Sequence, residues 1–245
     1  MNIIKLNAID STNVYLKKIA LLENCNNFTT VVATTQLKGR GQMGTTWQSE
    51  EGKNLTFSTL IKFKKFNIVD QFYISMAVSL AIVSVLNDIL VTKFSVKWPN
   101  DIMAEKDKVA GILIENVIKG SEISMSIIGI GLNVNQQFFP NDLYNATSLK
   151  LLSKKEYDLD FLLDQILKSI RNYSYLVQNK KYIELKESYL SNLYKFNVPT
   201  VFEDKDKLIF MGKIIDITEE GKLEVLLENE KTRKFDLKEI KFASF

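Results

Sequence analysis

The sequence predicts an α+β fold, in which a mixed or antiparallel sheet is flanked by helices and followed by a small antiparallel barrel. Two observations lead to this prediction. Along residues 2–134, β-rich segments recur, with helical periodicity between them. From Asn197 onward, short strands alternate with polar turns, which is typical of a small barrel. We therefore expect a larger domain at 1–195, which would carry any active site, and a barrel domain at 196–245.

Each element of the larger domain has its own signal. "DSTNVYLKKIALL" (10–22) offers helix-capping side chains, followed by apolar residues that are mostly at helical spacing. Residues 69–90 repeat apolar side chains at i, i+3 and i+4, which predicts a long helix with one apolar face. Residues 156–190 are helical by the same criterion. The expected strands lie at 2–7, 29–35, 54–63, 94–98, 101–105, 109–118 and 123–134.

The composition excludes several kinds of chemistry. The chain has 245 residues with ordinary globular composition, and its net charge of +3 is too small to indicate nucleic-acid binding by itself. It contains no histidine, so Ser-His-Asp and Cys-His triads and histidine metal sites are impossible. An enzyme built from this sequence would depend on positioning and on neutralising phosphate charge. Lysine, arginine, backbone N–H groups and Mg²⁺ can do this without histidine.

The N-terminus and the single cysteine bear on the compartment. "MNIIKLNAIDSTN" lacks the apolar core and cleavage site of a signal peptide, and no apolar run reaches the roughly 18 residues of a membrane helix. One cysteine, Cys25, cannot form an internal disulfide, which fits a reducing compartment. We therefore expect a cytoplasmic protein with no membrane partner.

The segment "GRGQMG" (39–44) has the G-x-G-x-x-G spacing of a dinucleotide-binding loop but not its surroundings. A strand precedes it, whereas the residues after it predict a second strand where the dinucleotide fold needs a helix. We expect the loop to join two strands and to let backbone N–H groups approach a ligand closely. Arg40 would then present a positive fork to a phosphate or carboxylate. A surface loop with incidental glycines is the alternative.

Three further segments place polar residues at the ends of strands. They are "KWPNDI" (97–102), "DKVAGILIE" (107–115) and "GIGLNVN" (129–135). Lys97, Asn100 and Asp101 flank a rigid Trp-Pro turn, Lys108 opens an apolar strand, and Asn133 follows a glycine-containing strand. Each alone has a bland alternative as a turn, a strand-end lysine or a bulge. Together they suit a site for a nucleotide and a small acid.

These segments, in this order and at similar spacing, resemble the biotin–protein ligases. "STN" (11–13), "TTQLKGRGQMGTTW" (34–47) and "NATSL" (145–149) extend the resemblance over nearly the whole chain. It implies a sheet with helices behind it, similar to class II aminoacyl-tRNA synthetases, followed by an SH3-like barrel. It also implies the monofunctional type, without the DNA-binding domain that many bacterial members carry, so no DNA partner is expected.

The resemblance implies a two-step reaction. Biotin carboxylate attacks the α-phosphate of ATP to give biotinyl-5′-AMP and pyrophosphate. A lysine of the biotin carboxyl carrier protein of a carboxylase then takes the biotinyl group and AMP is released. ATP and biotin are the expected substrates, with Mg²⁺ accompanying ATP. The chemistry suits a histidine-free chain, because a carboxylate is already ionised at pH 7. An exposed edge strand offers a route to a homodimer.

The resemblance also implies a role for each site residue. Lys108 and Arg40 are the expected catalytic residues. The residues expected at biotin are Ser11, Thr12, Asn13, Gln36, Gly39, Arg40, Gly41, Gln42, Lys108 and Gly111. The residues expected at ATP or the adenylate are Arg40, Trp47, Lys97, Asn100, Asp101, Lys108, Gly129 and Asn133.

Three of these residues keep alternative roles. Trp47 would close over either the adenine or the biotin tail. Asn133 would contact adenine or help to hold Mg²⁺. Asp101 would orient phosphate and metal, as the candidate Mg²⁺ contact through phosphate or water, or would help to deprotonate the incoming lysine.

The glycine loop departs from the "GRGRRGR" pattern of some relatives. Gln42, Met43 and Thr45 stand where those relatives have basic residues. Fewer positive charges predict faster loss of the adenylate.

Two other functions compete with biotin ligation. A lipoate–protein ligase would run the same reaction on a related fold. A nonenzymatic nucleic-acid-binding module would use the basic residues of the barrel, although interleaved acidic residues argue against it. These basic residues are Lys205, Lys207, Lys213, Lys222, Lys231, Arg233 and Lys234.

Overall fold

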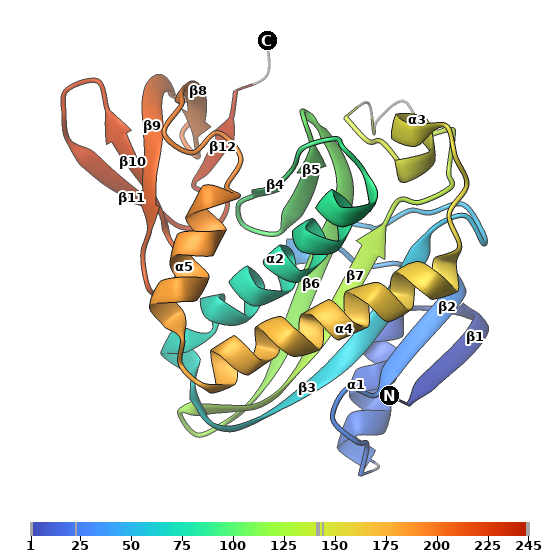
Figure 1. Ribbon diagram of the computed structural model, residues 1–245. Helices are drawn as coiled ribbons and strands as arrows, with labels where there is room; N and C mark the ends of the chain where they lie inside the picture. Colours follow the sequence, from blue (N-terminus) through green and yellow to red (C-terminus); the bar gives the residue numbers. More distant parts are fainter. Residues whose placement is uncertain (1, 23, 141–142, 144, 244–245) are drawn as a thin grey trace.

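The larger of two sheets forms the centre of the molecule (Figure 1). A computed structural model describes residues 2–22, 24–140, 143 and 145–243. The large sheet has seven strands in the order β1-β2-β3-β7-β6-β5-β4. Its first pair, β1 and β2, is parallel and the other pairs are antiparallel, so the predicted mixed sheet is confirmed. The strands are β1 (Ile3–Ile9), β2 (Thr30–Gln36), β3 (Leu55–Asn67), β4 (Phe94–Lys97), β5 (Asp101–Ala104), β6 (Asp107–Lys119) and β7 (Glu122–Leu132).

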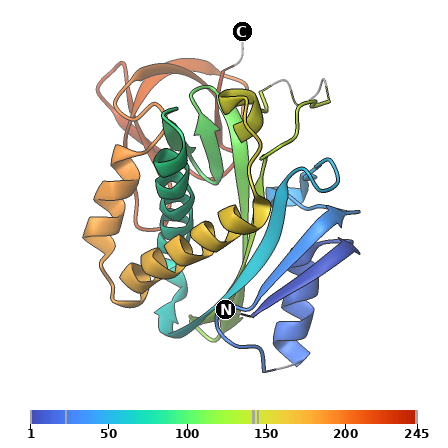
Figure 2. The same cartoon turned by 45° about the vertical axis from the view of Figure 1, so that its right-hand side comes forward.

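Helices cover the two faces of this sheet unequally. Leu60 of β3 packs in a small cluster with Leu16 of α1, whereas the next residue, Ile61, belongs to the main core beneath α2. Successive strand residues point to opposite faces, so α1 lies on one face and α2 and α4 lie on the other (Figure 2). Much of the α1 face therefore remains available for a site. The helices are α1 (Thr12–Leu22), α2 (Phe72–Ile89), α3 (Leu149–Ser153), α4 (Leu159–Gln178) and α5 (Tyr182–Ser191), with short 3₁₀ turns at Gln42–Gly44 and Ile68–Asp70.

The segment that contains α2 has a high mean hydropathy, although no uninterrupted apolar run in it is long enough for a membrane helix. Ile68–Ile89 is long and apolar enough, by length and composition alone, to cross a membrane. In the fold, 61% of its most apolar window is buried. Because α2 packs against strands of the sheet and against α4 and α5, burial in the core accounts for its apolar character.

The helical region 156–190 is divided into two helices. Helix α4 ends at Gln178, and Lys180 takes a left-handed conformation with φ 53°. Helix α5 then begins at Tyr182, whose ring stacks on Tyr73 of α2 with a centroid distance of 4.0 Å. The break therefore turns α5 onto α2. Sequence periodicity also missed α3, a short helix whose N-cap, Ser148, accepts a hydrogen bond from the Leu151 N–H.

The C-terminal strands form a second, antiparallel sheet that is barrel-like, in the order β11-β10-β9-β8-β12. Leu193 forms a bridge to Val96 of the large sheet, whereas Phe196 forms a bridge to Ile214 of the small one. The proposed domain boundary between 195 and 196 falls between these two bridges and stays a prediction. The small-sheet strands are β8 (Pro199–Asp204), β9 (Ile209–Ile217), β10 (Leu223–Leu227), β11 (Thr232–Phe235) and β12 (Ile240–Phe242).

Candidate functional site

A cavity of about 260 Å³ brings together segments that are far apart in the sequence. Its wall is formed by the start of α1, the end of β2, the glycine loop, and the glycines of β6 and β7. The predicted site residues that line it are Ser11, Thr12, Asn13, Gln36, Arg40, Gly41, Gln42, Trp47, Asn100, Asp101, Lys108, Gly111 and Gly129. Gly39, Lys97 and Asn133 were also predicted but are not among its lining residues.

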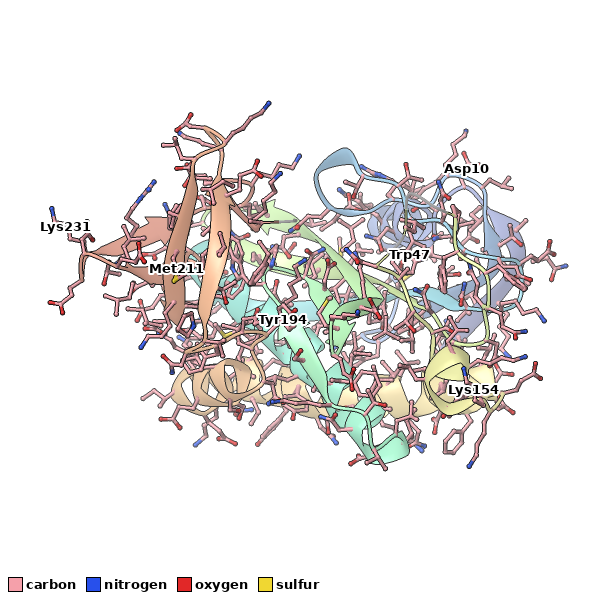
Figure 3. All side chains as sticks on the ribbon, turned by 90° about the horizontal axis from the view of Figure 1, so that it is seen from above. Asp10, Trp47, Lys154, Tyr194, Met211 and Lys231 are labelled. Atoms are coloured by element: carbon pink, nitrogen blue, oxygen red, sulfur yellow. The ribbon has the colours of Figure 1, made fainter. Side chains whose placement is uncertain are left out.

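Glycines form the floor of this cavity. Gly111 of β6 pairs with Gly131 of β7, and the indole of Trp47 lies against both. A Cβ atom on Gly131 would overlap the indole, and a Cβ atom on Gly129 would overlap the side-chain amide of Asn13. Viewed from above, Trp47 lies in the same half of the molecule as Asp10, away from the small sheet marked by Met211 and Lys231 (Figure 3). The strands thus gain space for an aromatic ring by omitting side chains.

The start of α1 supplies an uncharged polar end to the cavity. Ser11, Thr12 and Asn13 are 3%, 3% and 2% exposed. The side-chain oxygen Oε1 of Gln36 accepts hydrogen bonds from the backbone N–H of Thr12 at 2.8 Å and from Thr12 Oγ1 at 3.0 Å. The Asn13 side-chain amide donates to Glu115 Oε2 at 3.0 Å. Such an end suits a neutral, polar ligand group, because an unpaired buried charge would cost several kcal/mol.

The glycine loop folds back on itself over the cavity. The Gly41 N–H donates to the Thr45 carbonyl at 2.7 Å, and the Trp47 N–H donates to the Gly39 carbonyl at 3.0 Å. The expectation that the loop joins two strands is confirmed, since β2 precedes it, β3 follows it, and its one helical element is a 3₁₀ turn of three residues. Gly39 is thus placed in the backbone that holds Trp47.

Arg40 of this loop is half exposed. Its Nη1 lies 3.7 Å from Glu115 Oε1, and its side chain keeps 54% of its surface in contact with solvent. An ion pair this open is weak, because water screens both charges. The guanidinium is therefore free to exchange Glu115 for a stronger anionic partner.

The opposite end of the cavity is charged. Lys108 Nζ lies 2.6 Å from Asp101 Oδ1 and 5.8 Å from the centroid of the Trp47 ring. Both the backbone N–H and the backbone carbonyl of Lys108 form hydrogen bonds. Its N–H donates to the Asn145 carbonyl at 2.6 Å, and its carbonyl accepts from the Thr147 N–H at 2.9 Å. Segment 145–149 thus fixes the residue that carries the ammonium group.

Two predicted asparagines bind backbone in this structure. Asn100 Nδ2 donates to the Ile112 carbonyl at 2.8 Å, although Asn100 still lines the cavity. Asn133 Nδ2 donates to the Thr147 carbonyl at 3.0 Å, so its amide holds segment 145–149. The nucleotide-binding roles of both residues stay predictions.

Lys97 lines a neighbouring cavity of about 630 Å³ between the large and small sheets. Gln42 and Asp101 line both cavities, so the two are adjacent. Burial lowers the pKa of Lys97, and the charge of Lys108 lowers it further, while Asp101 acts in the opposite direction. The Trp98 indole N–H next to it donates to the Gly221 carbonyl at 2.9 Å, which ties this turn to the small sheet.

The residues around the cavity offer little for a metal ion by themselves. Asp101 is the one acidic residue among those lining the first cavity, and it is paired with Lys108. In the described part of the chain, no group of three His, Cys, Asp or Glu side chains could hold a metal. A Mg²⁺ ion here would take most of its ligands from phosphate and water, as Mg²⁺ usually does.

Sequence reasoning missed several residues of the site. Gly131 lay within a quoted motif but was not selected, and Thr45 and Thr46 lay in the glycine loop. Ser58 and Glu115 bond the residues at the start of α1. Glu115 ends a quoted motif but was not selected, and Ser58 is one more polar position in a strand. The remaining lining residues that were not selected are Phe57, Ile112, Leu113 and Ile130.

Comparisons with known proteins agree with this geometry. The chain is 31% identical over 213 residues to the bifunctional ligase/repressor BirA of Bacillus spizizenii, over 84% of this chain and 63% of the relative. It therefore spans less than two thirds of that relative. It is 30% identical over 127 residues to the biotin–[acetyl-CoA-carboxylase] ligase of Paracoccus denitrificans, over 51% of each chain.

A solved structure matches almost the entire fold. The biotin protein ligase from Aquifex aeolicus, in complex with biotin and ATP, has a TM-score of 0.82 and 29% identity to this chain, with 99% of both chains covered. The sequence profile of the biotin/lipoate A/B protein ligase family matches residues 6–133, more than half of the chain. The chain belongs to the biotin/lipoate A/B protein ligase family.

Proposed function

We propose that this protein activates biotin with ATP to form biotinyl-5′-AMP, and then transfers the biotinyl group to a lysine of a carrier protein. One observation supports this above the others. A single cavity joins a buried polar end at Thr12 and Gln36 to an end that contains Lys108, and Arg40 of the glycine loop also lines it. Biotin has the same polarity, with a neutral ureido head, an apolar tail and a carboxylate. The names of the relatives, biotin protein ligases, point the same way.

In the first step, a biotin carboxylate oxygen attacks the α-phosphorus of ATP, and the bond from that phosphorus to the bridging oxygen of the β-phosphate breaks. Both reactants are anions, so the barrier includes their mutual repulsion. The Lys108 ammonium, held against Asp101 at 2.6 Å, supplies a fixed positive charge. Arg40 adds a second charge when its loop closes over the ligand. Mg²⁺ would arrive with ATP and neutralise its phosphates.

In the second step, the uncharged amine of the acceptor lysine attacks the biotinyl carbonyl carbon. The bond from that carbon to the AMP oxygen breaks, and the amine gives up a proton. Glycine positions 111, 129 and 131 keep the cavity floor low enough for the ligand and the Trp47 ring to lie close to the strands.

The carrier protein, the compartment and the assembly belong to the same proposal. One relative is named a biotin–[acetyl-CoA-carboxylase] ligase, which supports a carboxyl carrier protein of such an enzyme as the acceptor. We expect this reaction to take place in the cytoplasm. Strand β1 lies at the edge of the large sheet and could pair with a second copy to form a homodimer.

ATP–pyrophosphate exchange tests the proposal. We expect exchange in the presence of biotin and none with lipoate, followed by transfer of radiolabelled biotin to a carrier domain. Exchange that depends on lipoate instead would favour the lipoate ligase alternative and overturn the proposal.

Basic residues of the C-terminal barrel-like region are interleaved with acidic partners, as in Lys222–Asp236 at 3.4 Å and Lys234–Glu224 at 3.1 Å. This interleaving counts against the nucleic-acid-binding alternative.

A further inference from the structure

We infer that Ser58 is a positioning residue for biotin recognition, although a ligand in the cavity would not touch it. The inference rests on the proposed function. Ser58 lies in β3, is 0% exposed, and is not among the residues that line the cavity. Its hydroxyl oxygen lies 2.7 Å from Thr12 Oγ1 and 2.6 Å from Asn13 Oδ1, and both of those residues do line the cavity.

The partners of Asn13 fix the direction of these hydrogen bonds. Asn13 Nδ2 lies 3.0 Å from Glu115 Oε2 and 3.3 Å from the Leu113 carbonyl, and both partners are acceptors. The amide nitrogen must therefore face β6, and the amide oxygen must face Ser58. Since Ser58 has a single proton, it donates that proton to Asn13 Oδ1. Thr12 Oγ1 then has Ser58 Oγ and Gln36 Oε1 as acceptors for its own proton.

Ser58 therefore links the two residues that begin α1. Gln36 at the end of β2 holds Thr12, Glu115 of β6 holds Asn13, and Ser58 between them in the sheet holds both. Without the Ser58 hydroxyl, Asn13 Oδ1 would lose its donor in a buried place, and Thr12 Oγ1 would keep Gln36 Oε1 as its one remaining partner of the two. The polar groups offered to the ureido head would then no longer be preorganised.

The neighbouring residue, Thr59, provides a matched control. Thr59 is also 0% exposed, and its hydroxyl bonds Thr30 Oγ1 at 3.0 Å. Because it follows Ser58 in the strand, its side chain points to the opposite face of the sheet, away from α1. Thr59→Val thus removes one buried hydroxyl from the same strand without changing the contacts of Thr12 or Asn13.

The test measures biotin-dependent ATP–pyrophosphate exchange and thermal unfolding for the wild type, Ser58→Ala and Thr59→Val. We expect Ser58→Ala to raise the KM for biotin about tenfold, with kcat within about twofold and the KM for ATP unchanged. We expect Thr59→Val to lower the Tm and to leave the KM for biotin unchanged. If the variants raise the KM for biotin equally, or if Ser58→Ala raises both KM values together, the inference is overturned.

A wild-type protein without biotin-dependent exchange would overturn the proposed function and this inference with it. If Ser58→Ala gives no cooperative unfolding transition, Ser58→Cys takes its place, because a thiol keeps the small size but is a weak donor. A selective rise in its KM for biotin supports the inference, and an unchanged KM for biotin counts against it.

Discussion

Gly131 lies directly beneath the indole ring of Trp47, so closely that a Cβ atom at this position would overlap the ring. Its cross-strand partner, Gly111, leaves the same ring more room, with 3.2 Å between a Cβ atom and Trp47 Cζ3. The indole nitrogen is buried and has no hydrogen-bond partner among the described residues. The position of the ring therefore depends on close packing against two glycines and not on a hydrogen bond from its nitrogen.

Gly131→Ala should displace Trp47. We expect kcat/KM for biotin-dependent exchange to fall at least tenfold, because the new methyl group forces the ring and the glycine loop away from the strands. Tryptophan emission should shift to longer wavelength as the indole becomes wetter, since the other tryptophan, Trp98, is buried and unaffected. Gly111→Ala is the graded control and should have a smaller effect on both measurements. If Gly131→Ala has the kcat/KM and the tryptophan emission of the wild type, the packing of Trp47 on Gly131 does not control the position of the ring.

Lys108→Ala should remove the charge to which the proposed mechanism assigns the main electrostatic role. By analogy with the loss of one preorganised donor, the cost in adenylate formation is about 3 kcal/mol, or roughly 100-fold in kcat for pyrophosphate exchange. The KM for biotin should change less, because the ammonium group acts mainly on the charge that develops at the phosphate. Lys106→Ala is the control, since Lys106 is an exposed lysine in the turn before β6. Equal activity of the two variants would remove Lys108 from the mechanism.

Much of the fold follows from local patterns in the sequence. The β-branched segment 29–35 becomes β2, and the segment 69–90 contains the predicted helix, α2. The expectation of one apolar face on this helix is wrong, because α2 is buried on nearly all sides between Phe72 and Leu86. Breaks inside long helical patterns were harder to predict. The break at Lys180 is followed by the stacking of Tyr182 on Tyr73, which is a contact between distant residues.

The site shows the same division between local and distant information. Arg40, Asp101 and Lys108 stand in rare, ordered motifs, and they line one cavity. Ser58 could not be selected from sequence, because its importance comes from a hydrogen bond to a residue 45 positions away. Glu115 ends the quoted motif at 107–115, but its hydrogen bond to Asn13, 102 positions away, could not be predicted. A polar residue in a strand gives no sign of which distant residue it holds.

Gln42→Arg should slow the loss of the adenylate. Gln42 lines the first cavity as well as the adjacent cavity beside Lys97, so a guanidinium at this position could reach a phosphate in either. A purified enzyme–adenylate complex, chased with unlabelled ligand, gives the release rate. An unchanged or faster rate for Gln42→Arg would contradict the expectation that the charge of this loop controls retention. Gln42→Leu is the matched control, and it should release the adenylate no more slowly than the wild type.

Lys97 should make the stability of the protein depend on pH in the alkaline range. Burial, the largest cause, lowers its pKa below the ordinary value of 10.5, whereas the unfolded chain keeps that value. Between the folded and unfolded pKa values the unfolded chain binds more protons, so this residue makes the free energy of unfolding rise with pH. The destabilising effect is complete below the folded pKa. Lys97→Met should therefore raise the Tm at pH values below the folded pKa of Lys97, and should remove the part of the rise in the free energy of unfolding that lies between that pKa and 10.5. Thermal unfolding at pH values from neutral to alkaline, with Lys106→Met as the exposed control, measures both effects.

The contrary result is a Tm that falls at pH 7, with the same dependence of Tm on pH as the wild type. It would mean that the contact of Lys97 with the Phe242 ring, at 5.3 Å, outweighs the cost of burying its charge.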